Sequence, residues 1–251
     1  MKIKNRFDRL IFEAESQPFA GWDFSFIEGR IHQLDTTWDY RNLVKARMQS
    51  SAKMLDMCTG GGEFLDSFET LPGITVATEG FLPNVPIAKN RLNPRGVSVF
   101  RIESDINLPF KDNYFDLVIN RHGSYSASEI RRISLRSDSH FITQQVGSAN
   151  ALGINDVLNC PLSQQPEWTL EIALETLNAQ GFQITNSVEE FPSMVFDDVG
   201  ALVYYLKAVP WQIPDFDTSK YWEQLKRVHR QIEADGRFEV TAHRFLIEAA
   251  G

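Results

Sequence analysis

Short apolar segments alternate with amphipathic segments through the middle of this chain, and this alternation constrains its fold more than any other feature. Breaks containing glycine or proline separate several of the segments. Such an order favours a parallel β-sheet joined by right-handed crossovers, with helices on both faces. We expect strands at residues 52–57, 74–78, 97–102, 114–120, 141–146, 182–191 and 238–249, and helices between them at 63–70, 84–92, 126–135 and 166–180. The sequence therefore predicts an α/β protein with a seven-stranded, mostly parallel sheet.

The two flanks of this pattern read as additions to a single domain whose core is residues 51–191. Residues 1–50 contain two helix-like stretches separated by many aromatic residues, and they predict a helical, aromatic cap. Residues 192–237 predict a helical insertion that forms part of a lid. Residues 238–251 then return as the last strand, which we expect to run antiparallel and to make a mixed edge of the sheet.

Composition limits the classes of function. The chain has 251 residues, of which 43% are hydrophobic and 23% charged, and its formal net charge is −8. This acidic balance argues against the broad basic face that nucleic-acid binding normally requires. Cys58 and Cys160 match no metal-ligand or redox spacing, so we expect no metal site and a reducing, cytoplasmic setting. We expect neither a signal peptide nor a membrane-spanning segment.

A glycine-rich turn, residues 58–62, directly follows the first predicted strand. In open α/β sheets ligands bind beyond the carboxyl ends of the strands, and glycine lets the backbone approach a ligand closely. The glycines here are consecutive, and Leu65 stands where a dinucleotide-binding fingerprint needs another glycine. Asp56 precedes the turn, and a buried carboxylate suits a cationic amine better than a pyrophosphate. The turn therefore disfavours a nicotinamide-dependent dehydrogenase.

Two further elements extend this candidate site. Glu79 closes the second predicted strand, where an acidic side chain can accept hydrogen bonds from both hydroxyls of a ribose. The segment 104–110, with the sequence Ser-Asp-Ile-Asn-Leu-Pro-Phe, follows the third strand, where an adenine would lie. Residues 114–120 then read Tyr-Phe-Asp-Leu-Val-Ile-Asn, the most hydrophobic of the predicted strands.

In this order the motifs resemble those of the class I S-adenosylmethionine (SAM)-dependent methyltransferases, especially the subgroup that methylates small molecules. The resemblance covers residues 52 to about 147 and implies a Rossmann-like fold and SAM as the cofactor. It implies a cofactor-binding role for eleven positions: Asp56, Cys58, Thr59, Gly60 and Gly62 at the methionine end, Glu79, Gly80 and Phe81 at the ribose and adenine, Asp105 and Ile106 at the adenine, and Asn120 near the methyl group. The family usually has glycine at the position of Cys58, and a side chain there would tighten the pocket.

The resemblance places Arg121 and His122 beside the methyl group and the substrate. His122 is the candidate catalytic residue, because its ordinary pKa suits a general base, although it could equally be a satisfied polar residue that lines the pocket. Arg121 could bind an acidic substrate group, but we favour pairing with a neighbouring carboxylate. Further candidates for the substrate site or lid are Trp22, Trp38, Tyr40 and Gln145. The three aromatic residues could simply pack the cap onto the sheet, and Gln145 could satisfy its amide with backbone or water.

The sequence thus predicts a SAM-dependent methyltransferase that transfers a methyl group, by in-line displacement, to an unidentified small-molecule acceptor. Two alternatives stay open. One is an RNA or protein methyltransferase, which a basic groove at the carboxyl edge of the sheet would support. The other is a non-catalytic, SAM-binding regulatory module. The sequence predicts a small-molecule partner rather than nucleic acid or membrane, and it does not determine the oligomeric state.

Overall fold

The computed structural model describes residues 3–19, 22–162 and 167–251. The chain divides into two compact units, which are described separately. The core unit comprises residues Thr37–Gly147, Trp168–Glu190 and Arg244–Gly251. The accessory unit comprises residues Met1–Thr36, Ser148–Glu167 and Phe191–His243.

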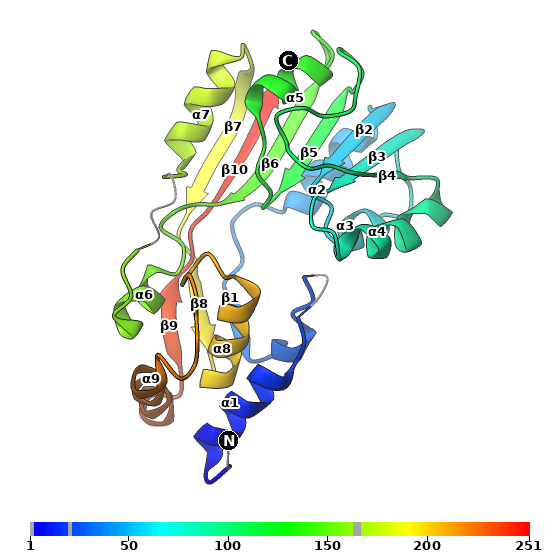
Figure 1. Ribbon diagram of the computed structural model, residues 1–251. Coiled ribbons are helices and arrows are strands. Elements are labelled where there is room, and N and C mark those ends of the chain that lie inside the picture. Colours follow the sequence, from blue (N-terminus) through cyan, green and yellow to red (C-terminus); the bar gives the residue numbers. More distant parts are fainter. Residues whose placement is uncertain (1–2, 20–21, 163–166) are drawn as a thin grey trace. The chain divides into compact units, whose positions relative to one another are not determined.

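The core unit is built on a seven-stranded sheet with the order β4-β3-β2-β5-β6-β10-β7 (Figure 1). Its strands are β2 (Lys53–Met57), β3 (Ile74–Glu79), β4 (Ser98–Arg101), β5 (Leu117–Arg121), β6 (His140–Val146), β7 (Gln183–Glu190) and β10 (Arg244–Ala250). The strands from β4 to β6 pair in parallel, and β10 pairs antiparallel with both β6 and β7. The predicted Rossmann-like sheet with an antiparallel last strand is therefore confirmed.

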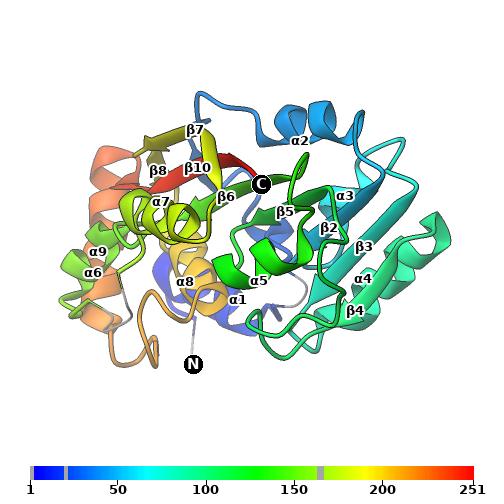
Figure 2. The ribbon, with the colours of Figure 1, turned by 90° about the horizontal axis from the view of Figure 1, so that it is seen from above.

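Helices cover both faces of this sheet (Figure 2). They are α2 (Tyr40–Met48), α3 (Glu63–Asp66), α4 (Asn84–Leu92), with the 3₁₀ turn Asn93–Arg95, α5 (Ala127–Ile133) and α7 (Leu170–Ala179). Side chains of α2, α3 and α4 share one hydrophobic cluster with Met54, whereas those of α5 and α7 share the other with Leu55. Successive residues of a strand point to opposite faces, so β2 needs apolar side chains on both sides, which explains its continuous hydrophobic sequence.

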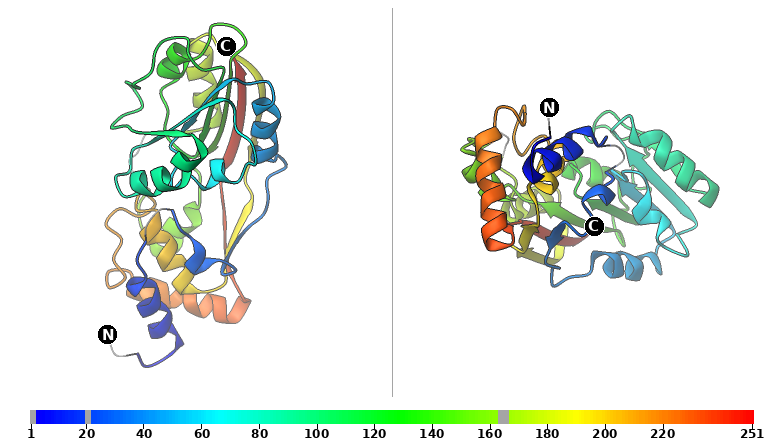
Figure 3. Two further views of the ribbon diagram at one scale, coloured as in Figure 1. Left: turned by 90° about the vertical axis from the view of Figure 1, so that its right-hand side faces the viewer. Right: turned by 90° about the horizontal axis from the view of Figure 1, so that it is seen from below.

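The accessory unit combines a small antiparallel sheet, of order β1-β8-β9, with helices (Figure 3). Its elements are α1 (Arg6–Ser16), the 3₁₀ turn Ser25–Ile27, β1 (Ile31–Gln33), α6 (Leu152–Leu158), β8 (Ser193–Phe196), α8 (Val199–Ala208), α9 (Trp222–Asp235) and β9 (Phe238–Thr241). Helix α8 is the centre of the unit, because all of its residues except Lys207 are buried. Helix α1 packs along α8, and their apolar side chains belong to one cluster.

The predicted last strand, 238–249, is two strands in two sheets. β9 joins the small sheet and β10 the large one, with Ala242 and His243 between them. The prediction that the returning strand lies at a sheet edge is wrong, because β10 lies between β6 and β7. Phe245 packs into the cluster on one face and Leu246 into the cluster on the other, so β10 has the double-sided burial of a central strand.

The boundaries of the additions also differ from those predicted. Of the predicted cap, residues 1–36 belong to the accessory unit and α2 belongs to the core unit. The predicted helical insertion contains β8, and residues 148–167, expected in the core, join the accessory unit. β1 and β8 were missed because three or four residues are too few to show an alternating pattern. That the cap and insertion act as a lid stays a prediction. In the described part of the chain, no helix has the length and apolar character needed to cross a bilayer.

Candidate functional site

The glycine turn lies at the carboxyl edge of the large sheet. β2 and β3 pair in parallel, so Met57 and Glu79 end at the same edge. The amide of Thr59 donates to the carbonyl of Thr78, with 2.9 Å between nitrogen and oxygen, which fastens the turn to β3. Gly62 has a φ of 86°, and a Cβ there would lie 2.8 Å from Cγ of Leu92. Glycine is therefore required at 62 both by the backbone and by close packing against α4.

Glu79 holds the turn through its carboxylate. Oε2 accepts a hydrogen bond from the amide of Gly60 and Oε1 accepts one from the amide of Phe81, each at 2.7 Å. Only 5% of Glu79 is exposed, and this burial raises the pKa of its carboxyl while the two amides oppose the rise. Each carboxylate oxygen still has acceptor capacity for a hydroxyl group.

Asp56 is the buried acid of the site, with 3% of its surface exposed. Burial raises the pKa of its carboxyl to about 7, and the charge of Glu79 adds to the rise. Oδ2 of Asp56 and the hydroxyl of Thr59 are buried, and neither makes a hydrogen bond of standard geometry among the described residues, although the hydroxyl lies near the Asp56 carboxyl and opposes the rise in its pKa. Buried polar atoms are rarely left unpaired, so two of them beside a glycine turn fit a ligand with a cationic or hydrogen-donating group.

Cys58 occupies the turn in a left-handed conformation, with a φ of 59°. That conformation explains why glycine suits this position. Its side chain packs under Gly123, where an added Cβ would lie 2.5 Å from Cβ of Cys58. Burial raises the pKa of the Cys58 thiol to about 12, and the carboxylates of Glu79 and Asp56 contribute. The thiol is protonated near neutral pH, which excludes it as a nucleophile.

Two large apolar side chains near this edge are exposed to solvent: Phe81 is 53% exposed and Ile106 is 71% exposed. Phe81 follows β3, and Ile106 follows β4, the neighbouring strand. Asp105, partly buried, precedes Ile106. Exposed apolar side chains at the ends of adjacent strands, beside a buried acid, suit a flat aromatic ring with polar edges.

Farther along the same edge, amide side chains of β5 and β6 form a buried network. Nε2 of Gln145 donates to Oδ1 of Asn120 at 2.6 Å and to Oγ1 of Thr143 at 2.7 Å. The indole N–H of Trp168 donates to Oε1 of Gln145 at 3.2 Å. The amides of Asn120 and Gln145 are thus satisfied by protein, and their role here is to hold the ends of the two strands together.

Tyr40 secures α2 over the same strands. Its buried hydroxyl lies 3.1 Å from the carbonyl oxygen of Asn120 and 3.4 Å from that of Ile142. Its ring contacts Phe64, with 5.3 Å between centroids. These contacts give Tyr40 a structural role in the core unit, because its only hydroxyl proton is engaged by the backbone.

His122 follows β5 and is joined to β6 through Gln144. Nε2 of His122 lies 2.9 Å from Nε2 of Gln144, and Oε1 of Gln144 accepts from the indole N–H of Trp38 at 2.8 Å. Part of His122 is exposed to solvent, but protein atoms surround much of its ring. The desolvation of the ring, and then the charges of Arg121 and Arg244, hold its pKa well below the ordinary range. Nε2 already accepts a hydrogen bond, so this atom does not have the free lone pair of a general base.

Arg121 is exposed at the same place, and its guanidinium lies 5.6 Å from the centroid of the Phe64 ring. Among the described residues no carboxylate lies within ion-pair distance of it. The favoured pairing of Arg121 with a neighbouring carboxylate does not take the form of a close ion pair here: the guanidinium stacks on an aromatic face, and its charge acts on buried Asp56, whose pKa it lowers.

Comparison with known proteins agrees with this geometry. Residues 55–135 match the family profile described as a methyltransferase domain. Over these residues the chain is similar to the methyltransferase domain that the profile describes. The matched segment runs from β2 to the end of α5 and so contains the glycine turn, Glu79 and Asp105. A sequence comparison with curated proteins gives no match.

Solved structures share the fold of this chain at low sequence identity. A provisionally assigned methyltransferase from Bacillus halodurans C-125 is 16% identical, with a TM-score of 0.61 over 84% of this chain and 98% of that one. A functionally unknown protein from Deinococcus radiodurans R1 is 13% identical, with a TM-score of 0.56 over 87% and 90%. The [4+2]-cyclase SpnF is 17% identical, with a TM-score of 0.53 over 84% and 78%.

The core unit contains all but one of the predicted site residues. The exception is Trp22, which lies in the accessory unit with its ring 5.8 Å from that of Trp211. Sequence reasoning assigned no role to Gly123, Thr143 or Trp168. The signal for the polar network was the pair of glutamines in an apolar strand, which required partners that the sequence alone does not identify.

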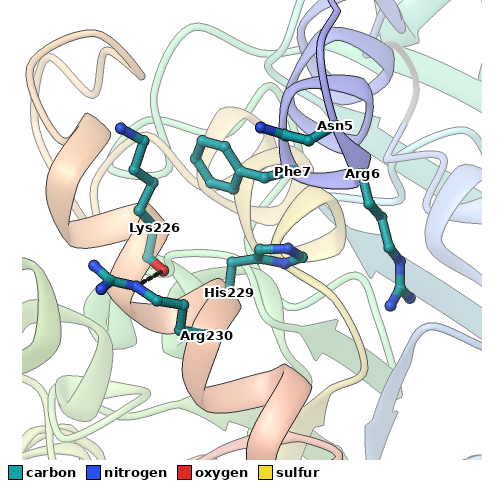
Figure 4. Close-up of a pocket in the computed structure, with 6 residues that line it drawn as sticks. All are labelled: Asn5, Arg6, Phe7, Lys226, His229 and Arg230. Atoms are coloured by element: carbon teal, nitrogen blue, oxygen red, sulfur yellow. Dashed lines mark hydrogen bonds between the residues drawn. The ribbon is translucent and has the colours of Figure 1, made fainter.

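One pocket of about 330 Å³ lies elsewhere, between α1 and α9 of the accessory unit (Figure 4). None of the predicted site residues lines it. Two of its cations already have acidic partners: Arg6 pairs with Glu233, and Lys226 pairs with Glu223. The carboxyl edge of the large sheet therefore stays the candidate functional site.

Proposed function

We propose that this methyltransferase binds SAM at the carboxyl edge of β2, β3 and β4 and transfers its methyl group to a small-molecule acceptor. The observation that carries the proposal is a pair of buried oxygen atoms, Oδ2 of Asp56 and Oγ1 of Thr59, which make no hydrogen bond of standard geometry among the described residues and lie next to the turn that Glu79 holds. SAM has a cationic amine, which would bind Asp56 and Thr59, and a ribose, which would bind Glu79.

Each residue has a role that follows from its position. Asp56 and the hydroxyl of Thr59 would hold the methionine end, Glu79 would accept from the ribose, and Phe81 and Ile106 would enclose the adenine. SAM supplies an electrophilic methyl group on a sulfonium, with a neutral leaving group. The protein has to place the attacking atom in line with the breaking bond and exclude water, and such positioning lowers a barrier by several kcal/mol.

A small acceptor fits the charge of the chain better than a nucleic acid does. The net charge of −8 disfavours a phosphate backbone as partner. At the carboxyl edge Arg121 presents an exposed guanidinium, and one such group is not the row of basic side chains that tracks a polynucleotide.

Calorimetric titration of the purified protein with SAM and with S-adenosylhomocysteine tests the cofactor. We expect one site per chain and a loss of binding of about tenfold or more in Asp56→Ala, since a charged hydrogen bond contributes about 1.5–3 kcal/mol. Glu103→Gln is the matched control, because Glu103 pairs only with exposed Arg101 in the core unit. If neither compound binds, the proposal is lost.

A second candidate is SAM binding without methyl transfer. It is favoured by the likeness to the [4+2]-cyclase, which shares the fold but is described by a different reaction, and by the cysteine within the glycine turn. Incubation with methyl-labelled SAM and a panel of small metabolites separates the two. Labelled product supports transfer, whereas tight binding with no transfer to any metabolite, RNA or protein supports the second candidate.

A further inference from the structure

A chain of three side chains fixes which nitrogen of His122 carries its proton. Trp38 begins the chain, because an indole N–H is a donor only. It lies 2.8 Å from the oxygen assigned as Oε1 of Gln144, and this contact settles the orientation of the Gln144 amide. Nε2 of Gln144 therefore faces His122, and this amide nitrogen can only donate.

The consequence for His122 is a single tautomer. Its Nε2 lies 2.9 Å from Nε2 of Gln144 and must accept a hydrogen bond there. A neutral imidazole whose Nε2 is the acceptor carries its proton on Nδ1. The backbone amide of His122 also donates to the carbonyl of Gln144 at 2.8 Å, so both ends of the residue are held by β6.

The neighbouring charges keep this ring neutral. Arg121 and Arg244 carry the positive charges that act on His122, and a third positive charge on the ring would be repelled by both. His122 has a φ of 64°, a left-handed conformation that non-glycine residues adopt mostly where the surroundings hold it. In the described part of the chain, Nδ1 of His122 has no hydrogen-bond partner.

We propose that Trp38 and Gln144 lock His122 as the Nδ1–H tautomer, and that this N–H together with the guanidinium of Arg121 binds an anionic oxygen group of the acceptor. That the bound group belongs to a methyl acceptor rests on the proposed function. His122 is then a hydrogen-bond donor and not the general base that the sequence suggests. Gln144 and Trp38 are positioning residues that act through His122.

Two features make an anionic group the best complement. The guanidinium of Arg121 has no carboxylate within ion-pair distance among the described residues, and the N–H of His122 has no acceptor. Two donors without acceptors, one of them charged, bind a carboxylate or phosphate oxygen more strongly than a neutral carbonyl oxygen.

The tautomer is tested by long-range proton–nitrogen correlation spectra of the full-length, nitrogen-15-labelled protein near pH 7, without SAM. We expect His122 to show a protonated Nδ1 and a bare Nε2, with its signals assigned by their loss in His122→Asn. In Gln144→Glu the new carboxylate accepts from both sides, so the proton should move to Nε2. The other four histidines are internal controls. A protonated Nε2 in the native protein, or an unchanged tautomer in Gln144→Glu, overturns the proposal.

The ligand class is tested by titrating the same sample with acetate, inorganic phosphate and neutral acetamide. We expect at least one of the two anions to shift the Nδ1–H signal of His122 at lower concentration than acetamide does. Arg121→Gln should lower the affinity for that anion by about tenfold, whereas Arg136→Gln, at an arginine outside the site, should leave it unchanged. Equal responses to all three probes, or none to either anion, overturn the anionic assignment. Absence of SAM binding alongside the expected tautomer would instead refute the proposed function alone.

Discussion

The backbone amide of Gly60 donates a hydrogen bond to Oε2 of Glu79, with 2.7 Å between nitrogen and oxygen. The residue expected to bind a ribose is thus also the residue that shapes the glycine turn. One carboxylate joins the ends of β2 and β3, so cofactor affinity and turn geometry depend on the same group. The first prediction follows from this double role.

Glu79→Gln should weaken cofactor binding more than it weakens the fold. A glutamine offers one acceptor oxygen, so its NH₂ group must face one of the two backbone amides that now donate to Glu79. We expect S-adenosylhomocysteine affinity to fall by about tenfold to a hundredfold, by calorimetry. Glu103→Gln serves as the control. Unchanged affinity would show that Glu79 only supports the turn.

Asp56 should make stability depend on pH. Its folded-state pKa, about 7, lies above the ordinary value of 3.8, so the folded protein holds this proton more tightly than the unfolded chain. The contribution is full below pH 3.8 and is lost as pH rises to about 7, by roughly 4 kcal/mol at most. Urea unfolding at several pH values should show a decline across this window that is smaller in Asp56→Asn. Parallel curves for the two proteins would contradict the assignment.

The same carboxyl should make cofactor affinity rise with pH. A cationic amine favours the ionised form of Asp56, so binding SAM near pH 6 must release a proton from it. Calorimetry in buffers of different ionisation enthalpy measures this release directly. We expect proton release in the native protein and less of it in Asp56→Asn, and equal release in both would locate the proton elsewhere.

Gly123 and Cys58 should be strongly coupled. A Cβ on Gly123 would lie 2.5 Å from Cβ of Cys58, so Gly123→Ala overpacks the turn and should cost about 1–3 kcal/mol of unfolding free energy. Cys58→Gly removes the obstacle and relaxes a left-handed residue, so the double variant should recover most of that loss. Chemical denaturation of the four proteins in the cycle measures the coupling. Additive losses would mean that the two residues do not meet.

Asp198 should stabilise the accessory unit in two separable ways. Its Oδ1 accepts from the amide of Ala201 at the start of α8, and its two oxygens pair with Arg30 at 2.7 and 2.8 Å. Asp198→Asn keeps a capping oxygen but loses the charge, and should cost about 2 kcal/mol. Asp198→Ala loses both and should cost about 3 kcal/mol. Thermal unfolding compares them, and equal costs would mean that the cap contributes nothing.

Much of the core unit was predictable from the sequence because its signals are local. Helix α4 begins and ends at the predicted residues 84 and 92, since its apolar face and the proline after it are written in consecutive positions. The position of Glu79 at the end of β3 followed from the pattern of the strand before it. No such local pattern marks the two-residue break between β9 and β10, because the two strands follow each other in one largely apolar stretch although they belong to different sheets.

The sequence by itself determined the sheet and the glycine turn, because hydrophobic period and motif spacing act over short stretches of chain. Tertiary structure alone decided how the polar side chains pair. Gln144 turns its oxygen to Trp38 and its nitrogen to His122, the contact on which the proposed tautomer of His122 rests. It also decided that Arg121 stacks on Phe64. Hydrogen bonds and ion pairs depend on distances of a few ångströms between residues far apart in sequence, and no local pattern encodes those distances.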